Sequence, residues 1–278
     1  DRAVLMRVRK AVTLAIANRK GGTGKTTVAV NLAAEFAALG RRVLLIDLDS
    51  QGHCAFGLGI KPSDTNVHRI FTDPKASLSQ AIQPTALENL WLAPADTLFD
   101  HGSGARDDDR LRGAIATEGV SDNFDIIIID TPPSLDTLLI NGLMAADRVL
   151  VPYVPHPLSF EGVRQLVRVL FKLMSGPNRK LKLLGFLPTM AAEHIRQHRA
   201  VTGDMTRQFG PHRVLAGVRT DIRLAEAFAA GRPIRYYAPK SRGAKDFAML
   251  ATSLVAVLVD HVELSISTER VPQLQSTI

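Results

Sequence analysis

One octapeptide, Lys20-Gly21-Gly22-Thr23-Gly24-Lys25-Thr26-Thr27, carries the most structural information in the chain. An apolar run at 11–17 precedes it and predicts a buried strand; a helical stretch follows from Lys25 to Leu39 and is closed by Gly40. A strand, a glycine loop and a helix N-terminus form the setting in which backbone N–H groups bind phosphate. The glycines let the backbone curl around an anion, Lys25 can reach the β- and γ-phosphates, and the Thr26 hydroxyl can bind Mg²⁺.

The loop also carries a second lysine. In the usual pattern, Gly-x4-Gly-Lys-Ser/Thr, the first glycine would stand at position 19, which is Arg19 here, and Lys20 follows it. Two lysines in one phosphate loop supply more positive charge than one triphosphate needs from one chain. This distinguishes the loop from the ordinary pattern.

A second apolar run, at 42–46, ends in two carboxylates, Asp47 and Asp49. In an open α/β sheet, ligands bind beyond the carboxyl ends of the strands. The two residues are two positions apart, so the strand period predicts that both side chains point the same way. One of them suits Mg²⁺ or the loop, and the other suits the orientation of a water molecule.

A third apolar run, at 124–130, contains four consecutive isoleucines and predicts a parallel strand buried on both faces. Asp130 ends this run, where a carboxylate can hold the water shell of Mg²⁺. Pro132 and Pro133 then force the chain out of the strand.

Together these motifs resemble the ParA/MinD group of deviant Walker ATPases, and most of all the small ParA-type partition ATPases. The motifs are Lys-Gly-Gly-x-Gly-Lys-Thr-Thr at 20–27, Asp-x-Asp-x-Gln-Gly at 47–52 and Asp-x-x-Ile-Ile-Asp-x-Pro-Pro at 125–133. Shorter pieces at 151–155, 160–162, 185–190, 223–227, 231–234 and 240–244 agree with it, so the resemblance covers roughly residues 11–260. It implies ATP and Mg²⁺ as cofactors, with the nucleotide bound by residues 20–27.

The resemblance also implies a role for individual residues. Lys20 matches the signature lysine that crosses to the partner's nucleotide in an ATP-sandwich homodimer, and Lys25 matches the ordinary phosphate lysine. Thr26 matches the Mg²⁺ ligand and Asp130 the Walker B carboxylate. Asp49 matches the carboxylate that positions the attacking water. The remaining matches are Asp47, which supports the loop or the metal shell, and Thr189, which lies where the adenine pocket is built.

Some positions depart from the family pattern. Thr23 replaces a usual Val without a change of size class, whereas Ser50 and His53 replace a Pro and an Asn in the turn after Asp49. The family's DNA-linked arginine falls on Thr220 here, with Arg219 one residue early, which weakens the case for DNA contact at that point.

The domain prediction is a single α/β domain at 1–266 with a mostly parallel twisted sheet and helices on both faces. A chain of 278 residues, 46% of them apolar, suits one such domain. Further strands are predicted near 89–93, 147–153, 181–187 and 213–218. Residues 61–120 are predicted to be a surface excursion, and residues 267–278 a flexible tail.

The charge is concentrated in the C-terminal half. Residues 151–278 hold 18 Lys and Arg against 9 Asp and Glu, and residues 1–150 hold 16 against 18. A basic face of this kind is the footprint of phosphate-backbone binding, and with few aromatic residues it favours sequence-independent duplex DNA over single strands. Within the basic stretch 196–245 the candidate DNA contacts are Arg196, Arg199, Arg219, Arg223, Lys240, Arg242 and Lys245.

The single cysteine, Cys54, excludes an intrachain disulfide and fits a reducing, cytoplasmic compartment. It also disfavours the nitrogenase-type iron proteins of this fold, which use two cysteines per subunit for their cluster. His194 and His198 have the spacing of a zinc pair, but no third ligand accompanies them, so a zinc site is not predicted there.

The expected function is a weak ATPase that works as a switch. ATP-dependent dimerisation would join two basic faces on nucleoid DNA, and a ParB-like or cargo-adaptor protein would stimulate hydrolysis and release. Two alternatives stay open. A MinD-like membrane ATPase would need a C-terminal amphipathic basic helix, which residues 265–278 do not show. A metabolic enzyme such as a dethiobiotin synthetase would use the loop for phosphoryl transfer to a small acid.

Overall fold

The computed structural model describes residues 10–61, 64–100, 107–192 and 194–268. One seven-stranded sheet organises them, in the order β3-β4-β2-β5-β1-β6-β7. Only β3 is antiparallel to its neighbour. The strands are β1 (Val12–Ile16), β2 (Val43–Asp47), β3 (Gln83–Pro84), β4 (Leu90–Ala93), β5 (Ile126–Asp130), β6 (Arg148–Tyr153) and β7 (Lys182–Pro188). The predicted fold class, an α/β domain with a mostly parallel sheet, is confirmed.

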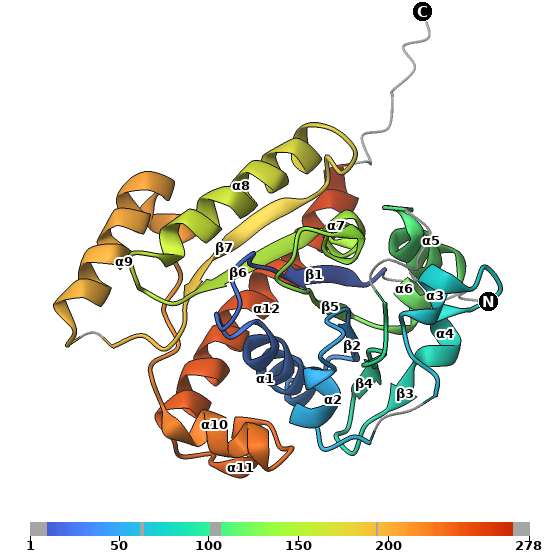
Figure 1. Cartoon of the computed structure of the whole chain (residues 1–278), viewed down its shortest axis with the longest axis horizontal. Helices are drawn as coiled ribbons and strands as arrows, with labels where there is room; N and C mark the ends of the chain where they lie inside the picture. Colours follow the sequence, from blue (N-terminus) through green and yellow to red (C-terminus); the bar gives the residue numbers. More distant parts are fainter. Residues whose placement is uncertain (1–9, 62–63, 101–106, 193, 269–278) are drawn as a thin grey trace, which may run out of the picture.

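Helices cover both faces of the sheet (Figure 1). On one face lie α1 (Lys25–Ala38), α2 (His53–Gly57), α10 (Ile222–Ala229), α11 (Ile234–Tyr237) and α12 (Arg242–Thr268). On the other lie α3 (Arg69–Thr72), α4 (Leu78–Ala81), α5 (Arg110–Thr117), α6 (Val120–Asn123), α7 (Thr137–Ala145), α8 (Ser159–Ser175) and α9 (Arg196–Phe209). A short 3₁₀ turn, η1 (Pro211–Arg213), follows α9.

The isoleucine run of β5 shows why the sheet needs helices on both sides. Ile126 and Ile128 belong to the core beneath α1, while Ile127 and Ile129 belong to the core on the opposite face. All four are fully buried. Because side chains alternate along a strand, a run of apolar residues without polar interruption must be covered twice.

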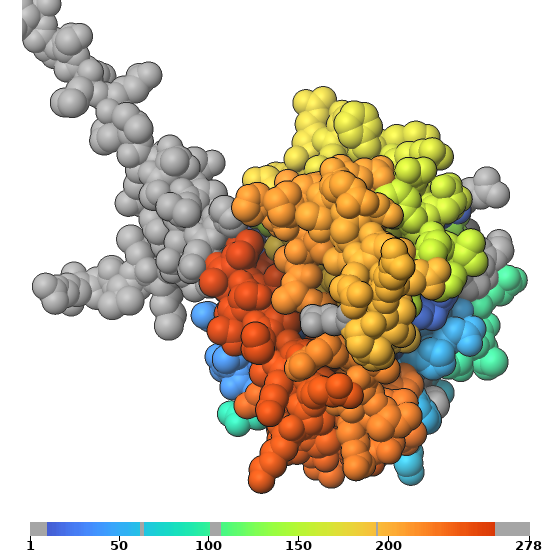
Figure 2. Space-filling view, turned by 90° about the vertical axis from the view of Figure 1, so that its left-hand side faces the viewer, coloured from blue at the N-terminus to red at the C-terminus, as the bar shows by residue number. Residues whose placement is uncertain are grey.

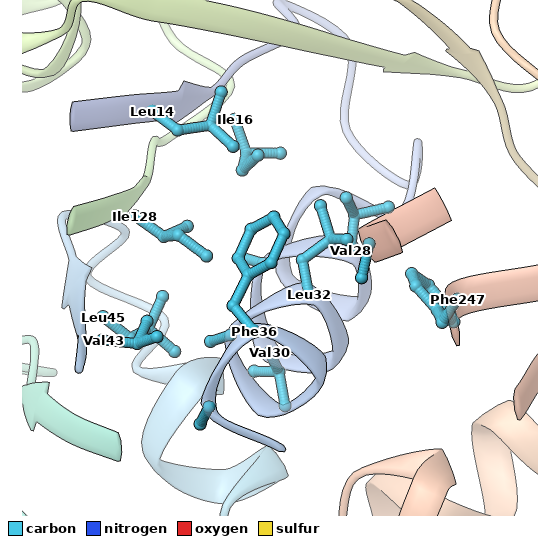
Figure 3. Close-up of a cluster of buried hydrophobic side chains, with 14 of the residues drawn as sticks. Leu14, Ile16, Val28, Val30, Leu32, Phe36, Val43, Leu45, Ile128 and Phe247 are labelled. Carbon is cyan, nitrogen blue, oxygen red and sulfur yellow. The ribbon is translucent and has the colours of Figure 1, made fainter. Parts of the chain in front are cut away.

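Helix α1 carries the phosphate loop and is held on two sides (Figure 3). Leu32 and Phe36 point toward Leu14 and Ile128 of the sheet, and Phe247 of α12 approaches α1 from the other side. Phe36 and Phe247 are both fully buried. This double packing fixes the helix whose first residues are Lys25 and Thr26.

The predicted strand at 213–218 is wrong. Its strand-type pairing with the neighbourhood of β7 consists of two isolated bridges, Phe186 with Val214 and Ala191 with Arg219. Val214 packs on the core beneath α8, whereas Val218 is buried in the core beneath α1. The segment therefore passes the edge of the sheet and supplies apolar side chains to both cores, which produced a strand-like pattern in the sequence.

The excursion predicted at 61–120 is more deeply packed than expected. Its described parts contribute β3, β4 and α5, and they bury Val67, Ile70 and Leu78 against the sheet. The sequence of this segment shows no clear hydrophobic periodicity, because its helices are only one or two turns long and prolines interrupt the apolar residues. At the other end of the chain, α12 runs to Thr268, and the rest of the predicted tail, 269–278, lies outside the described residues.

Helix α8 has an apolar inner face between Phe160 and Leu173. Val163, Leu166 and Leu170 are buried in its core. In the described ranges, no helix combines the length and the apolarity that a membrane crossing requires.

Strands β2, β5 and β1 lie side by side, so the residues at their carboxyl ends meet at one edge of the sheet.

Candidate nucleotide-binding site

The loop between β1 and α1 has the backbone shape of an anion cradle. Gly22 and Gly24 adopt φ values of 71° and 82°, the left-handed region that side chains disfavour. The Thr23 hydroxyl donates to the Lys20 carbonyl at 3.3 Å and closes the turn. Gly21 and Gly22 are exposed, whereas the Lys25 side chain is only 7% exposed. The loop predicted from residues 20–27 is thus formed, with Lys25 at its base.

Asn18 anchors the start of this loop, and sequence reasoning missed it. Its side-chain amide donates to the Pro152 carbonyl at 2.7 Å, and its oxygen accepts the Lys20 N–H at 3.0 Å. The residue is fully buried. A polar residue directly after an apolar strand was the available signal. Asn18 ties the phosphate loop to the end of β6.

Lys20 stands at the outer side of the cradle. Its backbone is held by Asn18, and its Cβ lies near Gly162 at the start of α8, where an added Cβ would come within 3.3 Å. Its side chain is partly exposed, and within the described ranges no ion pair engages it. The two predicted lysines therefore differ in setting: Lys25 is inside and Lys20 at the rim.

Thr189 buttresses the loop from β7. Its hydroxyl lies 2.9 Å from the Thr23 carbonyl and 3.2 Å from the Tyr153 carbonyl, and it has one proton to donate to them. Its side chain also stands about 3.7 Å from where a Cβ of Gly24 would be. Thr189 was predicted to lie at the adenine pocket; here it contacts the loop itself.

We expect Thr189→Val to weaken nucleotide binding. Valine keeps the shape but leaves a buried carbonyl without its donor, which costs about 1–3 kcal/mol of stability. Titration with a fluorescent ATP analogue should give a dissociation constant raised about 5- to 10-fold, since a looser loop must be ordered on binding. Thr206→Val, which removes a hydroxyl bonded within α9, is the control and should leave it unchanged. Equal dissociation constants for the Thr189 variant and the unaltered chain would refute the buttress.

A pocket of about 520 Å³ opens beside the loop. A volume of this order and a largely apolar lining are usual for a small-ligand site. Met190 adopts φ 49° at its entrance, a left-handed conformation that is uncommon outside glycine. The lining comes from the loop, α1, α2, the segment after β7 and α10, and includes Gly24, Thr27, Phe56, Thr189, Met190, Val218, Ile222, Leu224 and Phe228. Its place next to the phosphate loop suits the base and sugar of a nucleotide.

Asp130 faces Thr26 at the end of β5. The Thr26 hydroxyl donates to Asp130 Oδ2 at 2.6 Å, and the other carboxylate oxygen, Oδ1, is buried without a hydrogen-bond partner. Burial, offset by the Thr26 hydrogen bond and by the charge of Lys25, raises the pKa of Asp130 to about 6. A hydroxyl and a carboxylate oxygen with unused acceptor capacity fit the donor set that Mg²⁺ prefers. These two residues are the ones that would hold it, and that assignment stays a prediction.

Asp47 is a buried structural carboxylate. It is fully buried and accepts the N–H of Asp49 at 3.1 Å and that of Cys54 at 3.1 Å. Burial and the neighbouring Asp130 raise its pKa well above the usual range. Two backbone donors fix the turn after β2, which agrees with support of the loop; a direct metal contact remains a prediction.

Asp49 lies beyond the end of β2, which stops at Asp47. The strand period therefore does not apply to this pair, because residue 49 is already in the turn, and the shared direction of the two side chains stays a prediction. Asp49 is partly exposed, and its charge acts to raise the pKa of Lys25, although burial lowers that pKa more strongly. The carboxylate thus lies near the phosphate lysine, where it can meet a water molecule.

His68 holds the same turn and was not predicted. Its Nε2 lies 3.1 Å from the Leu48 carbonyl, and its Nδ1 accepts the Asp96 N–H at 2.8 Å. Since Nδ1 accepts, Nε2 is the nitrogen that carries the proton and donates. The ring is buried and stacks on Phe99 at 4.4 Å. His68 therefore links the peptide between Asp47 and Asp49 to the segment after β4.

The pH dependence of Mg²⁺ binding follows from Asp130. A raised pKa means that the folded chain disfavours the anion, so the contribution of this group to stability is full below its usual pKa of 3.8 and is lost as the pH rises to about 6. Mg²⁺ needs the anion. We expect its affinity in the nucleotide complex to fall about tenfold per pH unit below that point. Mg²⁺ titrations at several pH values, with Asp130→Asn as the control that lacks the dependence, measure it. An affinity equal on both sides of the pKa would contradict this assignment.

The segments that carry the predicted DNA-binding residues share one side of the molecule. Figure 2 shows the segments coloured from yellow-orange to red, α9 to α12, gathered on one face. Arg219 also interacts within the chain. Its guanidinium forms an ion pair with Asp246 at 2.7 Å, and the residue lines the pocket beside the phosphate loop. Arg223 pairs with Glu226 at 2.7 Å. The remaining candidates, Arg196, Arg199, Lys240, Arg242 and Lys245, are exposed.

Similarity to known proteins places the chain in a family. A family model described as an AAA domain matches residues 11–183. The chromosome-partitioning ATPase Soj of Thermus thermophilus is 36% identical over 247 residues, which are 89% of this chain and 96% of that protein. The chain belongs to the ParA/Soj family of partition ATPases. The resemblance drawn from the three motifs is thereby confirmed.

Solved structures support the fold of this ParA-type chain. The cobyrinic acid a,c-diamide synthase of Mycobacterium smegmatis, with bound ADP and magnesium, is 31% identical, has a TM-score of 0.74, and covers 88% of this chain and 94% of its own. The septum site-determining protein MinD of Pyrococcus horikoshii, complexed with Mg-ADP, is 25% identical with a TM-score of 0.74 and covers 88% and 96%. ParA-type and MinD-type proteins therefore share this architecture.

Proposed function

We propose that this ParA-type chain hydrolyses ATP in a Mg²⁺-dependent reaction. The observation that carries the proposal is the phosphate loop with Lys25 at its base and the Thr26–Asp130 pair at 2.6 Å beside it. Two similar structures hold ADP with magnesium. Bound Mg²⁺ would neutralise charge on the phosphates. Asp49 is proposed to orient the attacking water, and the pocket beside Thr189 to take the base.

We further propose that ATP drives dimerisation and that Lys20 acts on the partner's nucleotide. Lys25 already occupies the base of the cradle, and Lys20 stands partly exposed at its rim. A cation that enters from a second subunit stabilises the charge of phosphoryl transfer as an arginine finger does. The arrangement makes hydrolysis conditional on the dimer.

The basic face is proposed to bind duplex DNA without sequence preference. Exposed cations lie on α9 (Arg196), in the turn before α12 (Lys240) and in the first turn of α12 (Arg242 and Lys245), and Figure 2 shows the segments from α9 to α12 gathered on one face. Dimerisation doubles the number of phosphate contacts, and each contact adds to the salt dependence of binding. We infer a nucleoid-associated, cytoplasmic switch that positions a cargo and is stimulated by a ParB-like or adaptor protein.

The test of the proposed function is ATPase activity and DNA binding with one preparation. We expect slow, Mg²⁺-dependent hydrolysis, and duplex binding that needs ATP and falls at least about tenfold between low and physiological salt. The double variant Lys240→Glu with Arg242→Glu should lose DNA binding, and Lys75→Glu, exposed in the acidic half, should not. DNA binding of equal strength without nucleotide would leave only a passive basic protein.

A MinD-like membrane switch is the second candidate, and the similarity to the MinD structure favours it. Such a protein would sediment with liposomes of anionic lipid in the presence of ATP. We expect this chain to stay in the supernatant while it binds DNA. Sedimentation with liposomes and no DNA binding would replace the DNA switch by the membrane switch.

A metabolic role is the third candidate, because one similar structure is a cobyrinic acid a,c-diamide synthase. A metabolic enzyme of this fold would act on a carboxylic acid and would have no need for a partner subunit's lysine. Hydrolysis that is stimulated by DNA and lost with Lys20 would exclude it. Turnover that depends on a small carboxylic acid and ignores DNA would establish it.

A further inference from the structure

A thiol lies among the carboxylates of the nucleotide site. Cys54 Sγ stands 3.5 Å from Asp130 Oδ2, and one ligand atom from each of Asp47, Cys54 and Asp130 lies within 4.8 Å of the others. All three residues are fully buried. Two come from the adjacent ends of β2 and β5, and the third from the first turn of α2. The proposed reaction uses Thr26 with Asp130 and gives the sulfur no task.

The cluster also contains a buried carboxylate oxygen with unused acceptor capacity. Asp130 Oδ1 is buried with no hydrogen-bond partner, while Oδ2 takes both the Thr26 hydroxyl and the Cys54 thiol. A buried carboxylate oxygen without a donor is costly and calls for a ligand. The N–H of Cys54 also donates to Asp47 Oδ2 at 3.1 Å, which holds the sulfur beside the two acids.

We propose that Asp47, Cys54 and Asp130 form a binding site for a thiophilic divalent cation such as Zn²⁺. A thiolate and two carboxylates are a donor set that favours Zn²⁺ over Mg²⁺, and three protein ligands leave the fourth tetrahedral position open. On binding, the Cys54 S–H bond breaks, a metal–sulfur bond forms, and the thiol proton passes to solvent together with the proton of any carboxyl ligand that is protonated beforehand. The charges then balance: three anionic ligands meet one divalent cation and the nearby ammonium of Lys25, which interacts with Asp130.

The site has a consequence that rests on the proposed function. Asp130 cannot serve the Mg²⁺ of the nucleotide and the thiophilic cation at once. Thr26, which is partly exposed, lies 2.6 Å from it, so the cluster borders the phosphate loop directly. Zn²⁺ in this site therefore competes with Mg²⁺-dependent nucleotide binding, and Cys54 makes this chain sensitive to zinc.

Cobalt titration of the nucleotide-free full chain tests the site. Co²⁺ should bind one per chain with a near-ultraviolet sulfur-to-metal charge-transfer band, and Zn²⁺ should abolish the band. Cys54→Ala should lose the band and bind Zn²⁺ at least about 100-fold more weakly. Cys54→Ser, which keeps a hydroxyl at the position, should also lose the band. The double variant His194→Ala with His198→Ala removes the histidine pair at helical spacing and should behave as the unaltered chain.

The outcomes separate this site from the proposed function. A charge-transfer band that persists in Cys54→Ala, the absence of any band, or a Zn²⁺ affinity that depends on the histidine pair would each overturn the site and leave the ATPase proposal standing. A band lost with Cys54 in a chain that hydrolyses no ATP would support the site and refute the ATPase. Half-inhibition of hydrolysis by Zn²⁺ should move to at least about tenfold higher concentration in Cys54→Ala.

Discussion

Lys20→Ala should reduce ATP hydrolysis by at least about 10³-fold while ATP still binds. The physical reason is the division of work between the two lysines. Lys25 is buried at the base of the loop and serves the chain's own nucleotide, whereas Lys20 is partly exposed and no ion pair in the described ranges engages it. An added cation is worth this factor in phosphoryl transfer because it meets charge that develops in the transition state.

Two measurements on this variant check the assignment. ATP turnover under saturating Mg²⁺ gives the loss of rate, and titration with a fluorescent ATP analogue shows that the binding site survives. Lys61→Ala, an exposed lysine outside the loop, is the control and should hydrolyse ATP as the unaltered chain does. Full turnover by Lys20→Ala would remove the rim lysine from the mechanism, and loss of nucleotide binding would give it the role of an ordinary phosphate lysine.

Asp49→Ala is expected to slow hydrolysis by about 10²-fold or more and to leave the ATP state intact. The carboxylate lies in the turn held by Asp47 and His68, close enough to Lys25 to affect its pKa. Alanine removes the group that would align the water but none of the groups that hold the phosphates. The ATP-bound dimer should therefore accumulate and remain on DNA.

Size-exclusion chromatography and DNA retention with ATP or ADP measure this accumulation. The Asp49 variant should elute as a dimer with ATP and as a monomer with ADP, and its DNA complex should persist for as long as ATP is present. Asp64→Ala, an exposed carboxylate outside the site, serves as the matched control. Rapid turnover by Asp49→Ala would show that another group orients the water.

The parts of the site that could be predicted are those in which one residue type has one physical use. Glycines with positive φ, a lysine at a helix N-terminus and a carboxylate that ends an isoleucine strand each occupy the expected place, as Gly24, Lys25 and Asp130 show. The alternation of apolar runs with helical stretches also predicted the parallel sheet. These signals are local, so a sequence contains them in full.

What could not be predicted depends on contacts between distant segments. Asn18 meets Pro152 across 134 positions of the chain, and His68 meets the Leu48 carbonyl from a segment without a clear period. Arg219 pairs with Asp246 and lines the pocket, a contact between distant segments that the sequence does not show, and its contact with DNA stays a prediction. In each case the same side chain has several common uses, and tertiary packing selects among them.

Mixing two inactive variants tests the crossing lysine most directly. In a heterodimer of Lys20→Ala with Asp49→Ala, the site on the Lys20 variant keeps its own Asp49 and receives Lys20 from its partner. An equimolar mixture should therefore recover about a quarter of the unaltered rate, since half of the dimers are mixed and each mixed dimer has one complete site. A mixture as inactive as its components, in a preparation shown to form mixed dimers, would mean that Lys20 acts within its own chain.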